Sequence, residues 1–319
     1  MPSPPTVVPL LCYHRSGSSA IMSLLGESPR VLPLFELWNN FSHLRPHDAA
    51  LHATVLEAYT QRFGPGPNMT ERLLSHPARA VELAVGLARR LQRQTVTFKL
   101  FDVQCLMLWQ RQGRRCAECA RETFRRRLAL FRYDASLWVR RNFFQRRVSE
   151  HKVLAARCSS FRLTDSTNCT VELPLAHTFA VLRVGVAASA CLRCVAHGHC
   201  PHAHNASRPA AAEIEYDELR RLSEPARAAL VARKLAAVGG GGGAPTSGAR
   251  AASHYRVQDR RLALRSKLTN YPQLAAAYSP ERRRQLCQQG ARLFAAGDAA
   301  FEEETARWCE GSAEFDLPP

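Results

Sequence analysis

A short apolar run near the start of the chain, Thr6–Tyr13, ends in a Ser/Gly turn that leads directly into a segment with helical spacing. The run is rich in aliphatic and β-branched residues and is bounded by Pro and by Gly/Ser, which predicts a buried strand. From Ser18 to Gly26, the side chains of Ile21, Leu24 and Leu25 share one helical face. A strand that turns straight into a helix predicts a layered α/β fold with a largely parallel sheet.

The rest of the chain continues this alternation of strands and helices. We expect further strands at Thr95–Phe101, Ser136–Val139 and Ala212–Tyr216, and helices over about 78–93, 142–156, 217–238 and 280–308. The predicted fold class is therefore α/β, with a central, mostly parallel sheet flanked by helices. The 319 residues are expected to form one domain, with a glycine-rich flexible loop at 239–252.

The charge of the chain favours an anionic ligand. Lys and Arg number 44 against 27 Asp and Glu, a formal net charge of +17, and only four of the 44 are lysines. Arginine is the better bidentate partner for phosphate, sulfate and carboxylate, although a GC-rich genome would produce the same bias. Nucleic acid is not the expected partner, because aromatic residues make up only 8% and no nucleic-acid-binding motif is present.

Eleven cysteines and four Asn-x-Ser/Thr sequons point to an oxidising compartment. The sequons begin at Asn40, Asn68, Asn168 and Asn205. We therefore expect the Golgi or another secretory lumen, although no signal peptide precedes the first strand, and a cytoplasmic location follows if Met1 is the true start. No membrane span is expected, because Arg183 and Arg193 interrupt the most apolar segment, 179–195.

Cysteine and histidine side chains are crowded between Cys191 and His204. They are Cys191, Cys194, His197, His199, Cys200, His202 and His204. These ligand types suit Zn²⁺, but their spacing is too short for a zinc finger. Disulfides to other cysteines and a plain insertion are the two other interpretations.

The turn after the first strand, Arg15-Ser16-Gly17-Ser18-Ser19, has the composition of an anion-binding loop. A glycine lets the backbone turn tightly, and the amides that follow direct partial positive charge toward an anion at the helix N-terminus. The turn lacks the lysine and the magnesium-binding hydroxyl of Gly-x-x-x-x-Gly-Lys-Ser/Thr, which disfavours an ordinary kinase or ATPase. An ordinary strand-to-helix turn with a serine cap is the simpler alternative.

A second candidate anion site combines Arg141, at the end of an expected strand, with Ser149 eight residues later. If a helix begins near Asn142, Ser149 lies about two turns along it, so that both side chains can hold one phosphate. The simpler alternative is an arginine-rich, solvated helix. However, from Arg111 to Arg147 the chain has twelve arginines and only three acidic residues, so local pairing does not neutralise this stretch.

Together the two motifs resemble the sulfotransferases that use 3′-phosphoadenosine 5′-phosphosulfate (PAPS). In that family a 5′-phosphosulfate loop of the form Arg-Ser-Gly-Ser-Ser/Thr follows the first strand, and a strand-end arginine is followed by a serine eight residues on. Further segments resemble the family in the same order: Phe98-Lys99-Leu100, Glu215-Tyr216-Asp217-Glu218-Leu219 and Leu268-Thr269-Asn270-Tyr271. The resemblance spans about residues 6–278 and is closest to the branches that act on carbohydrates and on bacterial glycolipids.

This resemblance implies a P-loop NTPase-like, three-layer sulfotransferase fold and an enzyme that moves a sulfuryl group from PAPS to a hydroxyl. It implies that Arg15, Ser16, Gly17, Ser18 and Ser19 hold the 5′-phosphosulfate. It also implies that Arg141 and Ser149 hold the 3′-phosphate of PAPS. The acceptor would be a carbohydrate or glycolipid, possibly anionic, and the family needs no metal.

Three side chains are candidates for the chemical step. Glu36 lies where related enzymes have a catalytic glutamate, and its apolar neighbours favour a raised pKa. Lys99, at the end of a strand, is a candidate to contact the transferring sulfuryl group. His14, beside the loop, is the third candidate, although this position is not the usual one in the family.

Other functions remain open at this point. One is a phosphoryl transferase with a degenerate P-loop that uses ATP and Mg²⁺. Another is a basic protein that binds nucleic acid or glycans without catalysis.

Overall fold

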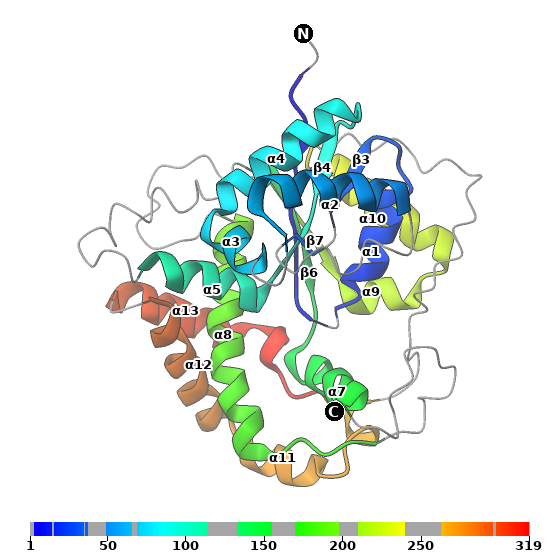
Figure 1. Ribbon diagram of the computed structural model, residues 1–319. Helices are drawn as coiled ribbons and strands as arrows, with labels where there is room; N and C mark the ends of the chain where they lie inside the picture. The colour runs from blue at the N-terminus through cyan, green and yellow to red at the C-terminus, as the bar shows by residue number, and fades with distance from the viewer. Residues whose placement is uncertain are drawn as a thin grey trace.

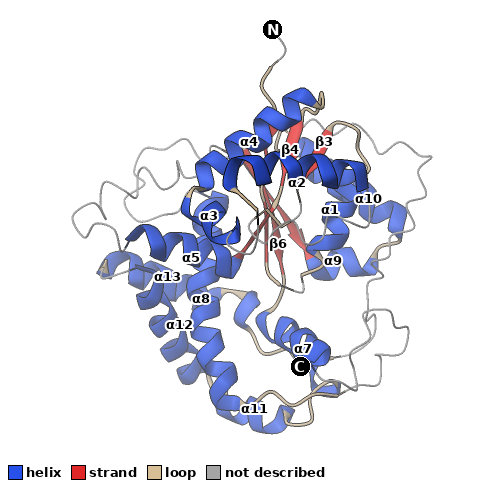
Figure 2. Ribbon diagram, in the orientation of Figure 1, coloured by secondary structure: helices blue, strands red, loops and turns tan. Residues whose placement is uncertain are grey.

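The computed structural model describes residues 3–14, 16–34, 36–37, 49–65, 69–113, 133–154, 170–197, 210–239, 263–295 and 298–318. Within these ranges the protein is an α/β structure in which helices enclose a parallel sheet (Figures 1 and 2). The sequence correctly predicted the α/β class and the parallel arrangement.

The centre of the sheet is the first strand, which has two parts, β1 (Thr6–Val7) and β2 (Leu10–Cys12). Pro9 separates them, because proline has no N–H to donate to a neighbouring strand. The adjacent strand has two parts as well, β4 (Thr95–Thr97) and β5 (Lys99–Phe101). The two parts keep the same register, and the amides of Val8 and Leu10 continue the ladder to β4 and β5 at 2.9 and 2.8 Å.

Three further strands complete a continuous parallel sheet. They are β3 (Val31–Pro33), β6 (Ala135–Arg140) and β7 (Ala210–Glu215). The spatial order is β3, β4/β5, β1/β2, β6, β7, and every neighbouring pair is parallel. The chain therefore winds to one side of β2 and then crosses to the other side. In open α/β sheets ligands bind at such a switch point, beyond the carboxyl ends of the strands.

Helices cover both faces of this sheet. One face is covered by α1 (Ser18–Gly26) and α10 (Glu224–Ala237), the other by α4 (Pro77–Arg90), α5 (Asp102–Gly113) and α8 (Leu175–His197). Helix α12 (Pro280–Ala295) packs on α8, and α13 (Ala299–Gly311) packs on α12 (Figure 1). The remaining helices are α2 (Ala49–Phe63), α3 (Met69–Ser75), α7 (Phe143–Leu154), α9 (Tyr216–Arg221) and α11 (Tyr271–Ala277), with 3₁₀ turns η3 (Leu264–Ser266) and η4 (Ala313–Phe315).

The apolar core has two parts. The larger cluster fills both faces of the sheet and includes Leu10, Leu11 and Phe98. The smaller one lies among α7, α8, α11, α12 and the C-terminal residues, and includes Phe144, Leu274 and Phe315. The second cluster lies beyond the carboxyl edge of the sheet, so it supports the elements that follow the strand ends (Figure 1).

Helix α8 explains the apolar segment that the sequence presents at 179–195. Among the described residues it is the one helix long and apolar enough to cross a membrane, despite its two interrupting arginines. However, 72% of its most apolar window is buried inside the protein, as in the central helix of a packed core.

Disulfides connect the helices of the outer layers. Cys105 on α5 is bonded to Cys191 on α8, and Cys287 on α12 to Cys309 on α13. Cys194 is also disulfide-bonded. The structure therefore supports the disulfide interpretation for Cys191 and Cys194, and no group of metal-ligating side chains is found among the described residues. His199, Cys200, His202 and His204 lie outside the described residues.

The predicted elements agree with the structure except at a few positions. The predicted helix over 280–308 is two helices, α12 and α13. The second begins at Ala299, after the N-cap Asp298, whose side chain accepts the amide of Phe301 at 3.1 Å. The helices predicted over 217–238 are α9 and α10. Strand β3 and helices α2, α3, α5, α8 and α11 were not predicted. The asparagines of the four sequons and the glycine-rich loop beyond Gly239 lie outside the described residues.

Candidate functional site

The turn between β2 and α1 has the backbone that an anion-binding loop needs. Gly17 has φ +77° and directly precedes α1, a left-handed conformation that favours glycine. The loop is fixed from below, because Ser16 donates both its amide and its hydroxyl to the carbonyl of Tyr13, at 3.3 and 2.7 Å. No acidic residue occupies the first turn of α1, so its N-terminal amides keep their positive potential. Arg15 lies outside the described residues.

Lys99 reaches this loop from the neighbouring strand. Its Nζ donates to Ser19 Oγ at 2.7 Å and lies 3.5 Å from Glu36 Oε1. Lys99 and Glu36 are both buried, with side chains only 1% and 7% exposed. The structure thus brings two of the three candidate catalytic residues together beside the loop, where they form an ion pair.

Burial also changes the acidity of this lysine. It lowers the pKa of Lys99, and the nearby Cys12 and Glu36 only partly offset this effect. Burial raises the pKa of the Cys12 thiol, which lies below the loop, to about 12. The lysine is therefore the group beside the loop whose proton is held less tightly than usual.

Arg141 lies close to the loop as well, through Tyr216 at the start of α9. The guanidinium carbon of Arg141 is 4.0 Å from the centroid of the Tyr216 ring. A Cβ on Gly17 would lie only 2.9 Å from the same ring. Residues of the two candidate anion-binding motifs, far apart in the sequence, therefore approach the ring of one tyrosine. Sequence analysis had noted Tyr216 only as part of a resemblance and gave it no role.

The two remaining candidate residues are Ser149 on α7 and His14 beside the loop. Helix α7 begins at Phe143, one residue after the predicted start, so Ser149 lies about two turns along it, as expected. His14 is exposed and stacks on Phe101, with ring centroids 4.1 Å apart and planes 7° from parallel. No contact joins His14 to Lys99 or Glu36 among the interactions of the described residues.

A substitution at Gly17 tests the geometry of this loop. We expect Gly17→Ala to lower the free energy of unfolding by at least about 1 kcal/mol, because alanine disfavours positive φ and its methyl group would displace Tyr216. Urea denaturation measures this change. The matched control is Gly86→Ala on α4, where no atom lies within 4 Å, and we expect it to be neutral or stabilising. Equal effects of the two substitutions would contradict the strained loop.

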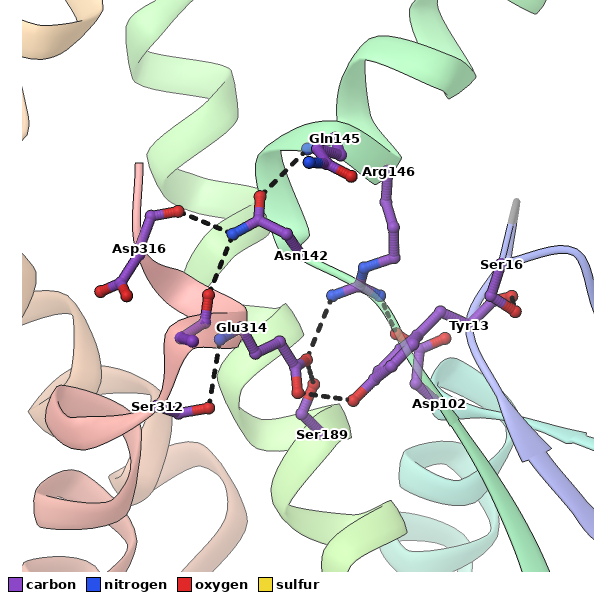
Figure 3. A network of polar contacts seen from close by, with 11 residues as sticks. Tyr13, Ser16, Asp102, Asn142, Gln145, Arg146, Ser189, Ser312, Glu314 and Asp316 are labelled. Atoms are coloured by element: carbon purple, nitrogen blue, oxygen red, sulfur yellow. Dashed lines mark hydrogen bonds and ion pairs between the residues drawn. The ribbon is translucent and has the colours of Figure 1, made fainter. Parts of the chain in front are cut away.

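Beneath the loop lies a buried polar network, which Figure 3 shows. Glu314, from the last 3₁₀ turn of the chain, accepts hydrogen bonds from Tyr13 Oη at 2.8 Å and Ser189 Oγ at 2.7 Å. Arg146 on α7 lies 3.5 Å from Glu314 and 3.2 Å from Asp102, and its guanidinium covers the Tyr13 ring at 3.8 Å. Sequence analysis identified none of these contacts, because the partners come from distant segments.

A groove of about 790 Å³ is lined in part by Asn142 and Asp217, the residues that follow Arg141 and Tyr216 in the chain. Its walls also include Gln145, Tyr278 and Arg283, and the apolar residues Leu317 and Pro318. The groove therefore has both polar and apolar walls and borders the residue that follows Arg141.

Comparison of the chain with models of known protein families, with curated proteins and with solved structures finds no match. The function must therefore be argued from the chemistry of the loop, Lys99, Glu36 and Arg141.

Proposed function

We propose that this protein is a sulfotransferase that moves a sulfuryl group from PAPS to a hydroxyl of a carbohydrate or glycolipid. The observation that favours it most is the approach of both Gly17 and Arg141 to the same ring, that of Tyr216. PAPS has two anionic ends, a 5′-phosphosulfate and a 3′-phosphate, and needs two cationic or amide-rich sites a nucleotide apart. The loop would supply one of these sites and Arg141 the other.

The chemistry of the donor set also fits PAPS. Amides and hydroxyls at Ser18 and Ser19 would bind the 5′-phosphosulfate, as helix N-termini bind other anions. Lys99 would place its charge beside the same group through its contact with Ser19. Arg141 and Ser149 would bind the 3′-phosphate, and Arg15 would add a further cation at the loop. When bound, PAPS supplies an activated sulfuryl group whose leaving group is a phosphate.

In the transfer step, the acceptor oxygen forms a bond to sulfur while the bond from sulfur to the 5′-phosphate oxygen breaks. A carboxylate oxygen of Glu36 would accept the proton of the acceptor hydroxyl. Lys99 Nζ would stabilise the negative charge that develops on the departing oxygen. His14 is the second candidate for the base, since it is exposed beside the loop.

The topology is also compatible with the P-loop NTPase-like sulfotransferase fold that the sequence resembles. The strand that precedes the loop is central in the sheet, and the next strands lie first on one side of it and then on the other. An oxidising secretory compartment such as the Golgi remains part of the proposal, and the disulfides of α5, α8, α12 and α13 fit it.

A phosphoryl transferase that uses ATP and Mg²⁺ is the second candidate. It is favoured by Asp102, a buried carboxylate directly after β5 that could approach a metal beside the loop. Against it, Arg146 already occupies one oxygen of Asp102. Among the described residues, the cation that contacts the loop is Lys99, which comes from a neighbouring strand.

Thermal-shift titration tests the donor site directly. We expect 3′-phosphoadenosine 5′-phosphate (PAP) to stabilise the wild-type protein, by about 2.7 kcal/mol at a hundredfold excess over its dissociation constant. Arg141→Ala is expected to weaken PAP binding at least about tenfold, since a charged hydrogen bond to the 3′-phosphate is lost.

Arg140→Ala is the matched control. Arg140 is the preceding residue, but its side chain pairs with Glu213 and Glu215 and covers Trp138, so PAP binding should persist. Stabilisation by ATP and Mg²⁺ alone would favour the phosphoryl transferase. If no nucleotide stabilises the folded protein, the proposed function is wrong.

A further inference from the structure

The C-terminal tail, residues 312–318, contacts a residue near each of the proposed anion-binding motifs. Its first contact is with the strand that leads into the loop. The Glu314 carboxylate accepts the hydroxyl of Tyr13 at 2.8 Å, and both side chains are buried. The carbonyl of Tyr13 in turn accepts the amide and the hydroxyl of Ser16. A continuous chain of hydrogen bonds therefore joins the tail to the residue before Gly17.

The second contact is with the residue that follows Arg141. Asn142 Nδ2 donates to the carbonyls of Ala313 and Asp316, at 3.1 and 2.7 Å. Its Oδ1 accepts the amide of Gln145 at 3.2 Å and so caps the start of α7 (Figure 3). The tail main chain thus fixes the junction between β6 and α7, from which Arg141 and Ser149 extend.

Arg146 completes the connection between these two contacts. It extends from α7, forms ion pairs with Glu314 and Asp102, and covers the ring of Tyr13. Because all of these groups are buried, their positions are coupled more strongly than those of a surface network.

The tail itself is held firmly by α11, α12 and α13. Tyr278 Oη donates to the carbonyl of Phe315 at 2.8 Å, and Arg283 donates to the carbonyl of Ser312 at 2.9 Å. The disulfide between Cys287 and Cys309 joins the two helices that precede the tail. The tail is therefore suited to hold two other segments at a fixed separation.

We propose that the C-terminal tail sets the distance between the phosphosulfate loop and Arg141, with Tyr13, Asn142 and Glu314 as positioning residues. This proposal rests on the proposed function, because the distance matters only for a ligand with two phosphate groups. A nucleotide with one phosphate needs only one of the two motifs in place. The tail therefore selects for the bisphosphate that matches its span.

Two variants test this proposal, and each removes the contact of the tail with one of the two motifs' neighbouring residues. Tyr13→Phe removes only the hydroxyl that Glu314 accepts, and Asn142→Ala removes the two bonds to the tail main chain. We expect each variant to bind PAP about tenfold more weakly than the wild type, as the loss of one or two hydrogen bonds would give. Binding of adenosine 5′-monophosphate and of adenosine 3′-monophosphate should change less than about threefold. Calorimetry with the three nucleotides measures the affinities.

The control is Tyr59→Phe, which removes another buried hydrogen bond made by a tyrosine hydroxyl. Tyr59 Oη on α2 donates to the carbonyl of Ala80 on α4 at 2.6 Å. It should alter the affinity for none of the three nucleotides. If Tyr13→Phe does not fold, Asn142→Ala at its partly exposed position decides the question alone.

The outcomes separate the two proposals. If the wild type binds PAP and a folded variant weakens all three nucleotides equally, or none, the positioning role is overturned while the donor site stands. If the wild type does not bind PAP, the proposed function fails, and the positioning role fails with it.

Discussion

Replacing Lys99 with methionine is expected to lower the turnover number for sulfuryl transfer by about 10²- to 10³-fold, with the affinity for PAP changed less than about threefold. Lys99 Nζ is buried and lies 2.7 Å from Ser19 Oγ, in the loop proposed to bind the 5′-phosphosulfate. Its charge stabilises the departing phosphate oxygen mainly after the bond to sulfur has begun to break, so it acts on the transition state more than on the bound donor. Transfer of labelled sulfate from PAPS, with PAP affinity from calorimetry, separates the two quantities.

The substitution also leaves Glu36 buried without its lysine, which lowers stability. The double variant Lys99→Met/Glu36→Gln removes that unpaired charge and should regain most of the lost stability while remaining inactive. Lys234→Met, at a partly exposed lysine on α10, is the control for the change from lysine to methionine and should keep wild-type turnover. A turnover number for Lys99→Met above about a tenth of the wild-type value would show that this lysine is not part of the transfer step.

The parts of the fold and site that sequence predicted are those encoded by local pattern. The strand, the turn at Gly17 and helix α1 follow one another directly, and each has its own compositional signal. Arg141 and Ser149 could be paired because a strand end and a helix have known rise per residue. The missed break before α13 also had a local signal, since Asp298 is a common N-cap residue.

What could not be predicted depends on contacts between distant segments. Sequence analysis placed Arg146 and Arg147 in a stretch with too many arginines for local pairing to neutralise its charge. In the structure, both arginines form ion pairs. The partners of Arg146 are Asp102 and Glu314, which lie 44 and 168 residues away along the chain. Similarly, Tyr216 comes to lie near both Gly17 and Arg141 only when β6 and β7 pair beside β2. Residue type and spacing identified the groups that could bind anions, whereas the groups that hold them in place required the folded chain.

Replacing Arg146 with alanine is expected to lower the free energy of unfolding by about 3–5 kcal/mol. Its guanidinium is buried between the carboxylates of Asp102 and Glu314, so its removal leaves two buried carboxylates without a counter-charge. The packing of the guanidinium on the Tyr13 ring is lost as well. Urea denaturation followed by circular dichroism measures the change. Arg147→Ala is the matched control on the same helix, since Arg147 pairs with the partly exposed Glu150 and should cost no more than about 1 kcal/mol.

Charge and packing contribute separately to this loss, and pH distinguishes them. Burial already raises the pKa of Glu314, and Arg146 is the main charge that opposes this rise. Without the arginine, the folded protein binds a proton at Glu314 at pH values where the unfolded chain does not, so its stability increases as pH falls through that raised pKa. The deficit of Arg146→Ala should therefore shrink toward acidic pH, and Arg146→Met/Glu314→Gln should be more stable than Arg146→Met. A deficit that neither low pH nor Glu314→Gln reduces would mean that Arg146 stabilises the network by packing on Tyr13 and not by its charge.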